Sequence, residues 1–219
     1  QLIVVRTTFG LLISHDGGCS FSWTCEDSIG YGGTFDPSYA VATDGPRLLV
    51  ADMDSTLIHI EVIDELARRH GVGDEVAEVT RRAMRGELDF AASLHARVAR
   101  LAGLDAAVLD DIAAHLPITD GAVALVRGIK QRGGYAAVVS GGFTFATTEL
   151  KGRIDLDHAY ANTLEIDGGR LTGRVLPPVV SPQRKADLVD QLAAHHGLAP
   201  ERVIAVGDGA NDLPMFERA

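Results

Sequence analysis

Residues 47–54, Arg-Leu-Leu-Val-Ala-Asp-Met-Asp, decide the fold of this chain. A short apolar run that ends in acids is typical of a strand buried on both faces. Two similar runs follow at residues 135–140 and 202–208, and stretches with helical patterning precede them at residues 121–132 and 183–196. Buried strands that alternate with helices predict an α/β fold with a parallel sheet. All three runs end in polar residues or glycine. Parallel sheets bind their ligands at this carboxyl end of the strands.

The first two strands are separated by far more residues than one crossover helix needs. Most of the intervening chain has helical patterning, so we expect an inserted helical cap at residues 58–119. The α/β core would then comprise residues 47–57 and 120–219. The expected cap helices are residues 61–70, 73–85, 88–102 and 105–115. Residues 162–166 and 170–176 flank an Asp-Gly-Gly turn and predict a β-hairpin.

Residues 1–46 differ from the rest, because they hold seven of the 24 glycines and no sustained periodicity. We expect an N-terminal lead-in or the remnant of a regulatory domain there. The chain begins with Gln and stops in a helix-like run at residues 213–219. We therefore expect a piece of a longer protein whose core is truncated at the C-terminus.

Composition limits the function. A hydrophobic fraction of 46% supports a packed core, and a formal net charge of −10 disfavours nucleic acid and anionic membranes as partners. No apolar run approaches the ~18 residues that span a bilayer. We expect a soluble, cytoplasmic protein, either a monomer or a homodimer, whose partner is a small-molecule substrate.

The acids at the end of the first strand are the first candidate site residues. Asp52 and Asp54 lie two positions apart, so their carboxylates would point the same way from an extended chain. Mg²⁺, a hard cation with oxygen ligands, would relieve their repulsion. One carboxylate is then available as a nucleophile and the other as a proton shuttle. The alternative is a pair of solvated acids that cap the next helix.

Three further segments carry candidate residues. Ser140 and Gly141 follow the second strand and can cradle an anion, or form an ordinary strand-to-helix turn. Lys185 is one of three lysines; it is either a phosphate-binding cation or a solvated helix residue. Asp208 and Asn211 lie in an acidic, glycine-flanked loop that favours a metal site over a capped turn.

His195 and His196 lie near the end of a predicted helix. We expect them to be an exposed helix end, because no second group of metal ligands accompanies them in the sequence.

Taken together and in this order, the four segments resemble the motifs of the haloacid dehalogenase (HAD) superfamily of phosphatases. These motifs are Asp-x-Asp-x-Thr, a strand-end Ser, a Lys and Gly-Asp-x-x-x-Asp. The resemblance covers residues 47–216 and implies a Rossmann-like core with a cap. Within the superfamily the chain is most similar to the phosphoserine phosphatase family, on the segments at residues 52–58, 61–67, 84–90, 140–143 and 206–212.

This resemblance implies substrate-binding roles for four cap residues. Glu61 would bind the substrate ammonium and Arg97 its carboxylate, with Met84 and Phe90 closing over it. Phe90 and Arg97 are seven positions apart and share a helix face, and Arg suits a carboxylate. Read without the family, Phe90 would belong to the cap core and Arg97 to the surface.

The implied activity is Mg²⁺-dependent hydrolysis of O-phospho-L-serine to L-serine and phosphate, the last step of serine biosynthesis. Asp52 would form an aspartyl-phosphate, and Asp54 would protonate the leaving oxygen and then activate water. Asp52, Asp208 and the Asp54 backbone carbonyl would hold Mg²⁺. The equatorial oxygens would be bound by Lys185, the Ser140 hydroxyl and the Gly141 amide, and Asn211 and Asp212 would support these ligands from behind.

Three alternatives remain open. One is a phosphotransferase that passes the phosphoryl group to another alcohol, such as homoserine. Another is a phosphatase for a different small phosphomonoester. The third is a non-catalytic amino-acid-binding or regulatory fragment.

Overall fold

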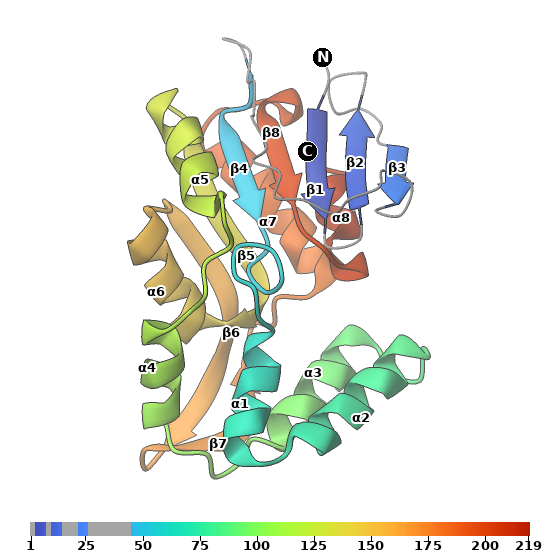
Figure 1. The fold of residues 1–219 in the computed structure, drawn as a ribbon, viewed down its shortest axis with the longest axis vertical. Helices are drawn as coiled ribbons and strands as arrows, with labels where there is room; N and C mark the ends of the chain where they lie inside the picture. The colour runs from blue at the N-terminus through green and yellow to red at the C-terminus, as the bar shows by residue number, and fades with distance from the viewer. Residues whose placement is uncertain (1–2, 8–9, 15–21, 26–44) are drawn as a thin grey trace.

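The computed structural model describes residues 3–7, 10–14, 22–25 and 45–219. Its largest element is a five-stranded sheet with the order β7-β6-β5-β4-β8. Strands β8, β4, β5 and β6 are parallel, and β7 pairs with β6 in the antiparallel sense. The strands are β4 (Leu48–Ala51), β5 (Tyr135–Phe143), β6 (His158–Asp167), β7 (Arg170–Leu176) and β8 (Val203–Val206). The predicted α/β class with a mostly parallel sheet is confirmed (Figure 1).

Helices cover both faces of this sheet, as the apolar runs require. The helices outside the β4–β5 connection are α5 (Ala122–Gln131), α6 (Thr144–Ile154), α7 (Pro182–His195) and α8 (Leu213–Phe216). Alternate residues of a strand point to opposite faces. Leu49 and Val138 accordingly pack in one core cluster with α5 and α6, while Val50 and Val139 pack in a second with α7 and α8.

Four helices lie between β4 and β5: α1 (Val62–His70), α2 (Gly73–Met84), α3 (Phe90–Ala99) and α4 (Ala107–Ala114). The two strands that this insertion separates are direct neighbours in the sheet. The chain enters and leaves the insertion side by side, because Ile58 and Ile118 form an antiparallel bridge. The His59 amide donates to the Pro117 carbonyl at 2.9 Å. That residues 58–119 form a cap stays a prediction.

Two details differ from the sequence prediction. Strand β5 does not stop before its glycines but continues to Phe143, with a register shift between Val139 and Phe143 where it pairs with β6. Conversely, β4 ends at Ala51 and the chain turns at once, since the Met53 carbonyl accepts the amides of Thr56, Leu57 and Ile58. Asp54 therefore lies in a turn and not on an extended strand.

The expectation for His195 and His196 holds in part. They lie at the end of α7 and His195 is exposed, but a third histidine does accompany them. His158, the first residue of β6, lies beside the end of α7, and its Nε2 is 2.9 Å from Nε2 of His196. The three histidines form a group that was not visible in the sequence, because His195 comes 37 positions after His158. The parallel β5–β6 pairing and the packing of α7 bring them together.

Most of residues 1–46 lie outside the described part of the chain. The predicted lead-in or remnant of a regulatory domain therefore falls outside the described residues as well. The described pieces are β1 (Ile3–Thr7), β2 (Gly10–Ser14) and β3 (Ser22–Cys25). They form an antiparallel sheet in the order β1-β2-β3. Among the described helices, none has both the length and the apolar character that a membrane crossing needs.

Candidate active site

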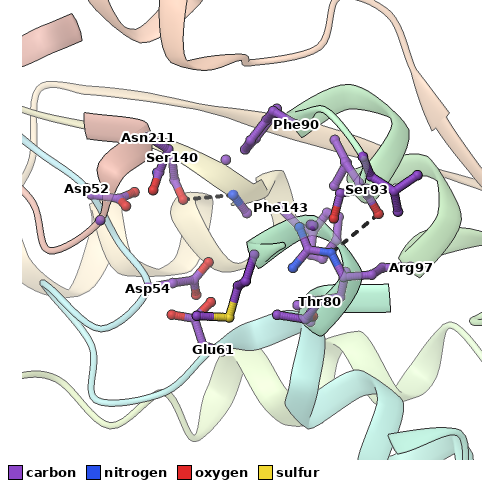
Figure 2. A pocket seen from close by; sticks show the side chains of 18 of the residues that line it. Asp52, Asp54, Glu61, Thr80, Phe90, Ser93, Arg97, Ser140, Phe143 and Asn211 are labelled. Carbon is purple, nitrogen blue, oxygen red and sulfur yellow. Dashed lines mark hydrogen bonds between the residues drawn. The ribbon is translucent and has the colours of Figure 1, made fainter. Parts of the chain in front are cut away.

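A cavity of about 370 Å³ lies at the carboxyl ends of β4, β5 and β8, beneath residues of α2 and α3. Its size suits a small metabolite. Asp52, Ser140 and Asn211 lie toward one side of it, and Arg97, Thr80 and Ser93 toward the other (Figure 2). The predicted site residues that line it are Asp52, Asp54, Glu61, Met84, Phe90, Arg97, Ser140, Gly141, Asp208 and Asn211.

Lys185 is the one predicted site residue outside the cavity lining. It lies in the first turns of α7, which starts at Pro182 after a Ser181 cap whose Oγ accepts the Arg184 amide. The Lys185 side chain is fully buried, and its Nζ lies 3.0 Å from Asp52 Oδ1 and 2.7 Å from Asp212 Oδ1. A buried cation needs such partners. The alternative of a solvated helix lysine is therefore wrong.

Asp52 is held by contacts on one carboxylate oxygen. Its Oδ1 accepts from the Met53 amide at 2.7 Å and from Lys185. Within residues 45–219, its Oδ2 accepts no hydrogen bond. Burial raises the pKa of Asp52 to about 6, and Lys185 limits that rise. For Lys185, burial works to lower the pKa, but Asp52 and Asp212 outweigh it and raise the pKa above its ordinary value.

Asp54 has a different environment. Its Oδ1 accepts the Val62 amide at 3.1 Å, which ties it to the start of α1. Burial raises the pKa of Asp54 well above its ordinary value, and the negative charges of Glu61 and Asp52 add to the rise. Asp52 is bonded to a cation, whereas the nearest charges around Asp54 are acids. Neighbouring carboxylates with different environments are suited to different proton-transfer roles.

The end of β5 forms one wall of the cavity. Ser140 is almost completely buried, and its Oγ accepts the Gly142 amide at 2.9 Å. A Cβ atom at Gly142 would overlap Asp54 Oδ2, and one at Gly141 would lie 3.0 Å from the Phe90 ring. Glycine is therefore required at position 142, and its absence of a side chain lets Asp54 approach the strand.

Asn162 fixes this wall from behind. It is fully buried on β6, its Nδ2 donates to the Gly141 carbonyl at 2.7 Å, and its Oδ1 accepts the Val180 amide at 2.8 Å. One side chain thus joins β5, β6 and the segment that leads into α7. Sequence reasoning missed Asn162, because it lies inside a predicted hairpin strand far from any motif.

The loop after β8 brings further acids to the cavity. Asp208 Oδ1 accepts from Thr56 Oγ1 at 3.3 Å, and Asp212 Oδ2 accepts the Gly209 amide at 3.1 Å. Burial raises the pKa of Asp208, and the charge of Asp212 raises it further. Carboxylate oxygens of Asp52, Asp208 and Asp212 lie within 4.8 Å of one another.

These residues fit a divalent metal ion. Oxygen donors are what hard cations such as Mg²⁺ prefer, and the acids around the cavity outnumber the basic residues Lys185 and Arg97. The clustered side chains include Asp212, which was expected only to support the ligands. The Asp54 carboxylate is not a member of this cluster, and metal binding by the Asp54 backbone carbonyl stays a prediction.

Glu61 and Arg97 add two opposite charges to the cavity lining, Glu61 beside Asp54 and Arg97 on the side away from Asp52 (Figure 2). Glu61 precedes α1, and its Oε1 accepts from Ser55 Oγ at 2.7 Å. Burial raises the pKa of Glu61. Arg97 is largely buried on α3, where its Nε donates to the Ser93 carbonyl at 3.4 Å, and burial lowers its pKa. That Glu61 binds the substrate ammonium and Arg97 its carboxylate stays a prediction.

The two hydrophobic residues predicted for this region differ in exposure. Phe90 begins α3, where the Asp89 side chain caps the helix, and its ring lies against Gly141. Met84 ends α2 and is 83% exposed, although it lines the cavity. Thr80 and Ser93, which sequence reasoning did not single out, add hydroxyl groups to the same wall.

Comparison with known proteins gives a consistent result. The family model described as haloacid dehalogenase-like hydrolase matches residues 49–217. A phosphoserine phosphatase of Archaeoglobus fulgidus is 50% identical over 181 residues, which are 83% of this chain and 53% of that protein. A substrate-bound phosphoserine phosphatase structure has a TM-score of 0.75 at 39% identity, covering 80% of this chain and 84% of that one.

A second solved structure, described as a phospho-aspartyl intermediate analogue of phosphoserine phosphatase, has a TM-score of 0.74 at 40% identity. It covers 80% of this chain and 84% of that one. The chain spans about half the length of the first curated relatives that it matches. The family match covers the sheet, the four inserted helices and the acidic cavity. This chain therefore belongs to the haloacid dehalogenase-like hydrolase family.

Proposed function

We propose that this chain is a phosphoserine phosphatase that hydrolyses O-phospho-L-serine through an aspartyl-phosphate on Asp52. One observation carries the proposal. The same cavity holds a lysine-bonded aspartate on one side and Arg97 on the other, with Glu61 beside Asp54 (Figure 2). A phosphate ester of an amino acid carries a phosphate group at one end and an ammonium and a carboxylate group at the other. The relatives named above, which are phosphoserine phosphatases, support this choice of substrate.

Asp52 is the proposed nucleophile. Lys185 and the Met53 amide hold its Oδ1, so Oδ2 is available for attack on phosphorus. The attack breaks the bond between phosphorus and the serine oxygen. Asp54, whose raised pKa favours its protonated form, gives its proton to that leaving oxygen. The same carboxylate, now ionised, takes a proton from the water that hydrolyses the aspartyl-phosphate.

The wall of β5 would bind the transferred phosphoryl group. Ser140 and the Gly141 amide supply hydrogen-bond donors, and Asn162 fixes the Gly141–Gly142 peptide. Lys185 neutralises Asp52 from behind, since its Nζ is bonded to Asp52 and Asp212. Asp52, Asp208 and the Asp54 carbonyl are the proposed ligands of Mg²⁺, with Asp212 and Asn211 beside them. The ion would offset the negative charge that phosphate brings into this acidic site.

The inserted residues 58–119 are the proposed cap. They supply Glu61, Arg97, Phe90 and Met84 to the cavity. The paired crossing at Ile58 and Ile118 is a suitable hinge, because both connections to the core can bend together. Closure would exclude water from the reaction and opening would release serine.

The direct test is phosphate release from O-phospho-L-serine with and without Mg²⁺. We expect turnover by the wild-type chain with Mg²⁺ and by Asp110→Asn, an exposed carboxylate control on α4. We expect none by Asp52→Asn. Equal release by wild type and Asp52→Asn would overturn the proposal. Adding acceptor alcohols such as homoserine separates hydrolysis from transfer, since a transferase would yield a new phosphate ester.

A further inference from the structure

Three histidines gather away from the cavity, where β6 begins and α7 ends. They are His158, His195 and His196. His158 pairs with Ala137 near the start of β5, whereas the acidic site lies at the carboxyl ends of the strands. The proposed reaction uses none of the three.

The geometry of this histidine cluster suits one metal ion. Ring nitrogens of all three residues lie within 4.8 Å of one another, and the His158 and His196 Nε2 atoms are 2.9 Å apart. Two imidazole nitrogens on a tetrahedral zinc ion, each at about 2.0–2.1 Å from it, are ~3.3 Å apart. The 2.9 Å contact is shorter than that value and the 4.8 Å limit is longer, so the three rings are close enough to share one ion.

The surroundings of His158 and His196 hold these two rings in place and favour their neutral form. The Tyr135 ring stacks on His196 with centroids 3.6 Å apart and an interplanar angle of 18°. Asp157, next to His158, is held by the Ala136 amide and by Lys130, each at 2.9 Å. Burial lowers the pKa of His158 and of His196, so both imidazoles keep a free lone pair at neutral pH.

We propose that His158, His195 and His196 form a second metal site, which binds a divalent transition metal ion of the zinc class. Imidazole selects Zn²⁺, Cu²⁺ or Ni²⁺, whereas carboxylates select Mg²⁺, so the two ends of the sheet would take different ions. Three protein ligands leave a fourth position for water. The bound ion would join the end of α7 to the start of β6 and stabilise the fold.

The test is a titration with Zn²⁺ against a competing fluorescent chelator, in saturating Mg²⁺ so that the acidic site is filled. We expect one Zn²⁺ per wild-type chain. His195→Gln and His196→Gln should each weaken binding at least tenfold. His115→Gln, which removes an exposed histidine of the α4 end, should stay within twofold of wild type. His195→Gln leaves the His158–His196 contact intact, so a loss there does not reflect misfolding.

The electron paramagnetic resonance spectrum of bound Cu²⁺ identifies the ligands. Hyperfine splitting from several nitrogens in the wild type, which is lost in His196→Gln, supports the site. The proposal is overturned if the wild type binds no Zn²⁺ under these conditions. It is equally overturned if Asp208→Asn, and not the histidine variants, abolishes binding, since the ion would then occupy the acidic cluster. Neither result bears on phosphatase activity.

Discussion

At the scale of single residues, Lys185 is the group on which the site depends most. It is fully buried between two carboxylates, Asp52 and Asp212, and each contact is within hydrogen-bonding distance. Breaking a buried pair by removing one partner is strongly destabilising, because it leaves uncompensated charge. In the proposed function, the Lys185 side chain therefore contributes both to catalysis and to the stability of the fold.

Replacing this cation tests both roles. Lys185→Met should lower kcat by about 10²–10³, the usual cost of losing one electrostatic contact in the transition state. At pH 7.5 without metal, the free energy of unfolding should fall by about 3–5 kcal/mol. Lys151→Met, on an exposed position of α6, is the matched control. Wild-type kcat in a folded Lys185→Met variant would remove Lys185 from the account.

Arg97 determines selectivity in the proposed function. Arg97→Ala should raise KM for O-phospho-L-serine by about 10–100-fold, since hydrogen bonds to charged groups contribute about 1.5–3 kcal/mol. KM for phosphoethanolamine, which lacks the carboxylate, should change little. Arg100→Ala removes an exposed arginine next to the same helix and controls for loss of helix charge. Equal losses on both substrates would show that Arg97 does not bind the carboxylate.

At the scale of elements, the site requires β5, β6 and α7 to keep their relative positions. Asn162 makes that connection with one donor and one acceptor, to Gly141 and to Val180. Both partners are backbone groups, so these two hydrogen bonds do not depend on the side chains of the residues that Asn162 contacts. A buried backbone group that loses its partner costs about 1–3 kcal/mol.

Asn162→Ala should therefore lower both stability and kcat, because the Gly141–Gly142 peptide loses its anchor. Thr163→Ala changes the next, exposed position of β6 and should leave both quantities near wild type. Steady-state kinetics at a temperature where circular dichroism shows both variants folded separates the two effects. An unchanged kcat in folded Asn162→Ala would mean that the residue supports only the fold.

Much of this architecture could be predicted from the sequence, because the runs of residues that form the central strands are recognisable in the local sequence. Residues 48–51, 135–139 and 203–206 are continuous apolar runs, and their polar ends mark the edge where the cavity lies. The missed features all depend on tertiary contacts. The side-chain partners of Asn162 and His158 are 18 to 38 positions away in the sequence, and no local pattern reveals that Lys185 is buried.

At the scale of the whole molecule, the acidic cavity links metal binding to pH. The pKa of Asp52 is raised from 3.8 to about 6, so the folded state binds more protons than the unfolded state in this range. The stability that this group contributes without metal is complete below pH ~4 and is lost as the pH rises through about 6. Metal ligands must be deprotonated, so in the proposed function Mg²⁺ would have to displace this proton.

The rise in Tm on adding Mg²⁺ should consequently be larger at pH 7.5 than at pH 5. At pH 5 about nine in ten chains hold a proton on Asp52, which lowers the apparent affinity for Mg²⁺ about tenfold. Differential scanning fluorimetry with and without Mg²⁺ measures the difference. Groups outside the site titrate equally in both samples at a given pH. Their effect on Tm therefore cancels in the difference between the samples with and without Mg²⁺. Equal gains at both pH values would show that Asp52 is not a metal ligand.

The most direct measurement is to trap the covalent intermediate. The chain is mixed with ³²P-labelled O-phospho-L-serine and Mg²⁺, quenched with acid within the first turnovers, and mapped by peptide mass spectrometry. We predict label on the peptide that contains Asp52, released by hydroxylamine as expected of an acyl phosphate. Continued turnover with no protein-bound label, or label on another residue, would contradict the central claim.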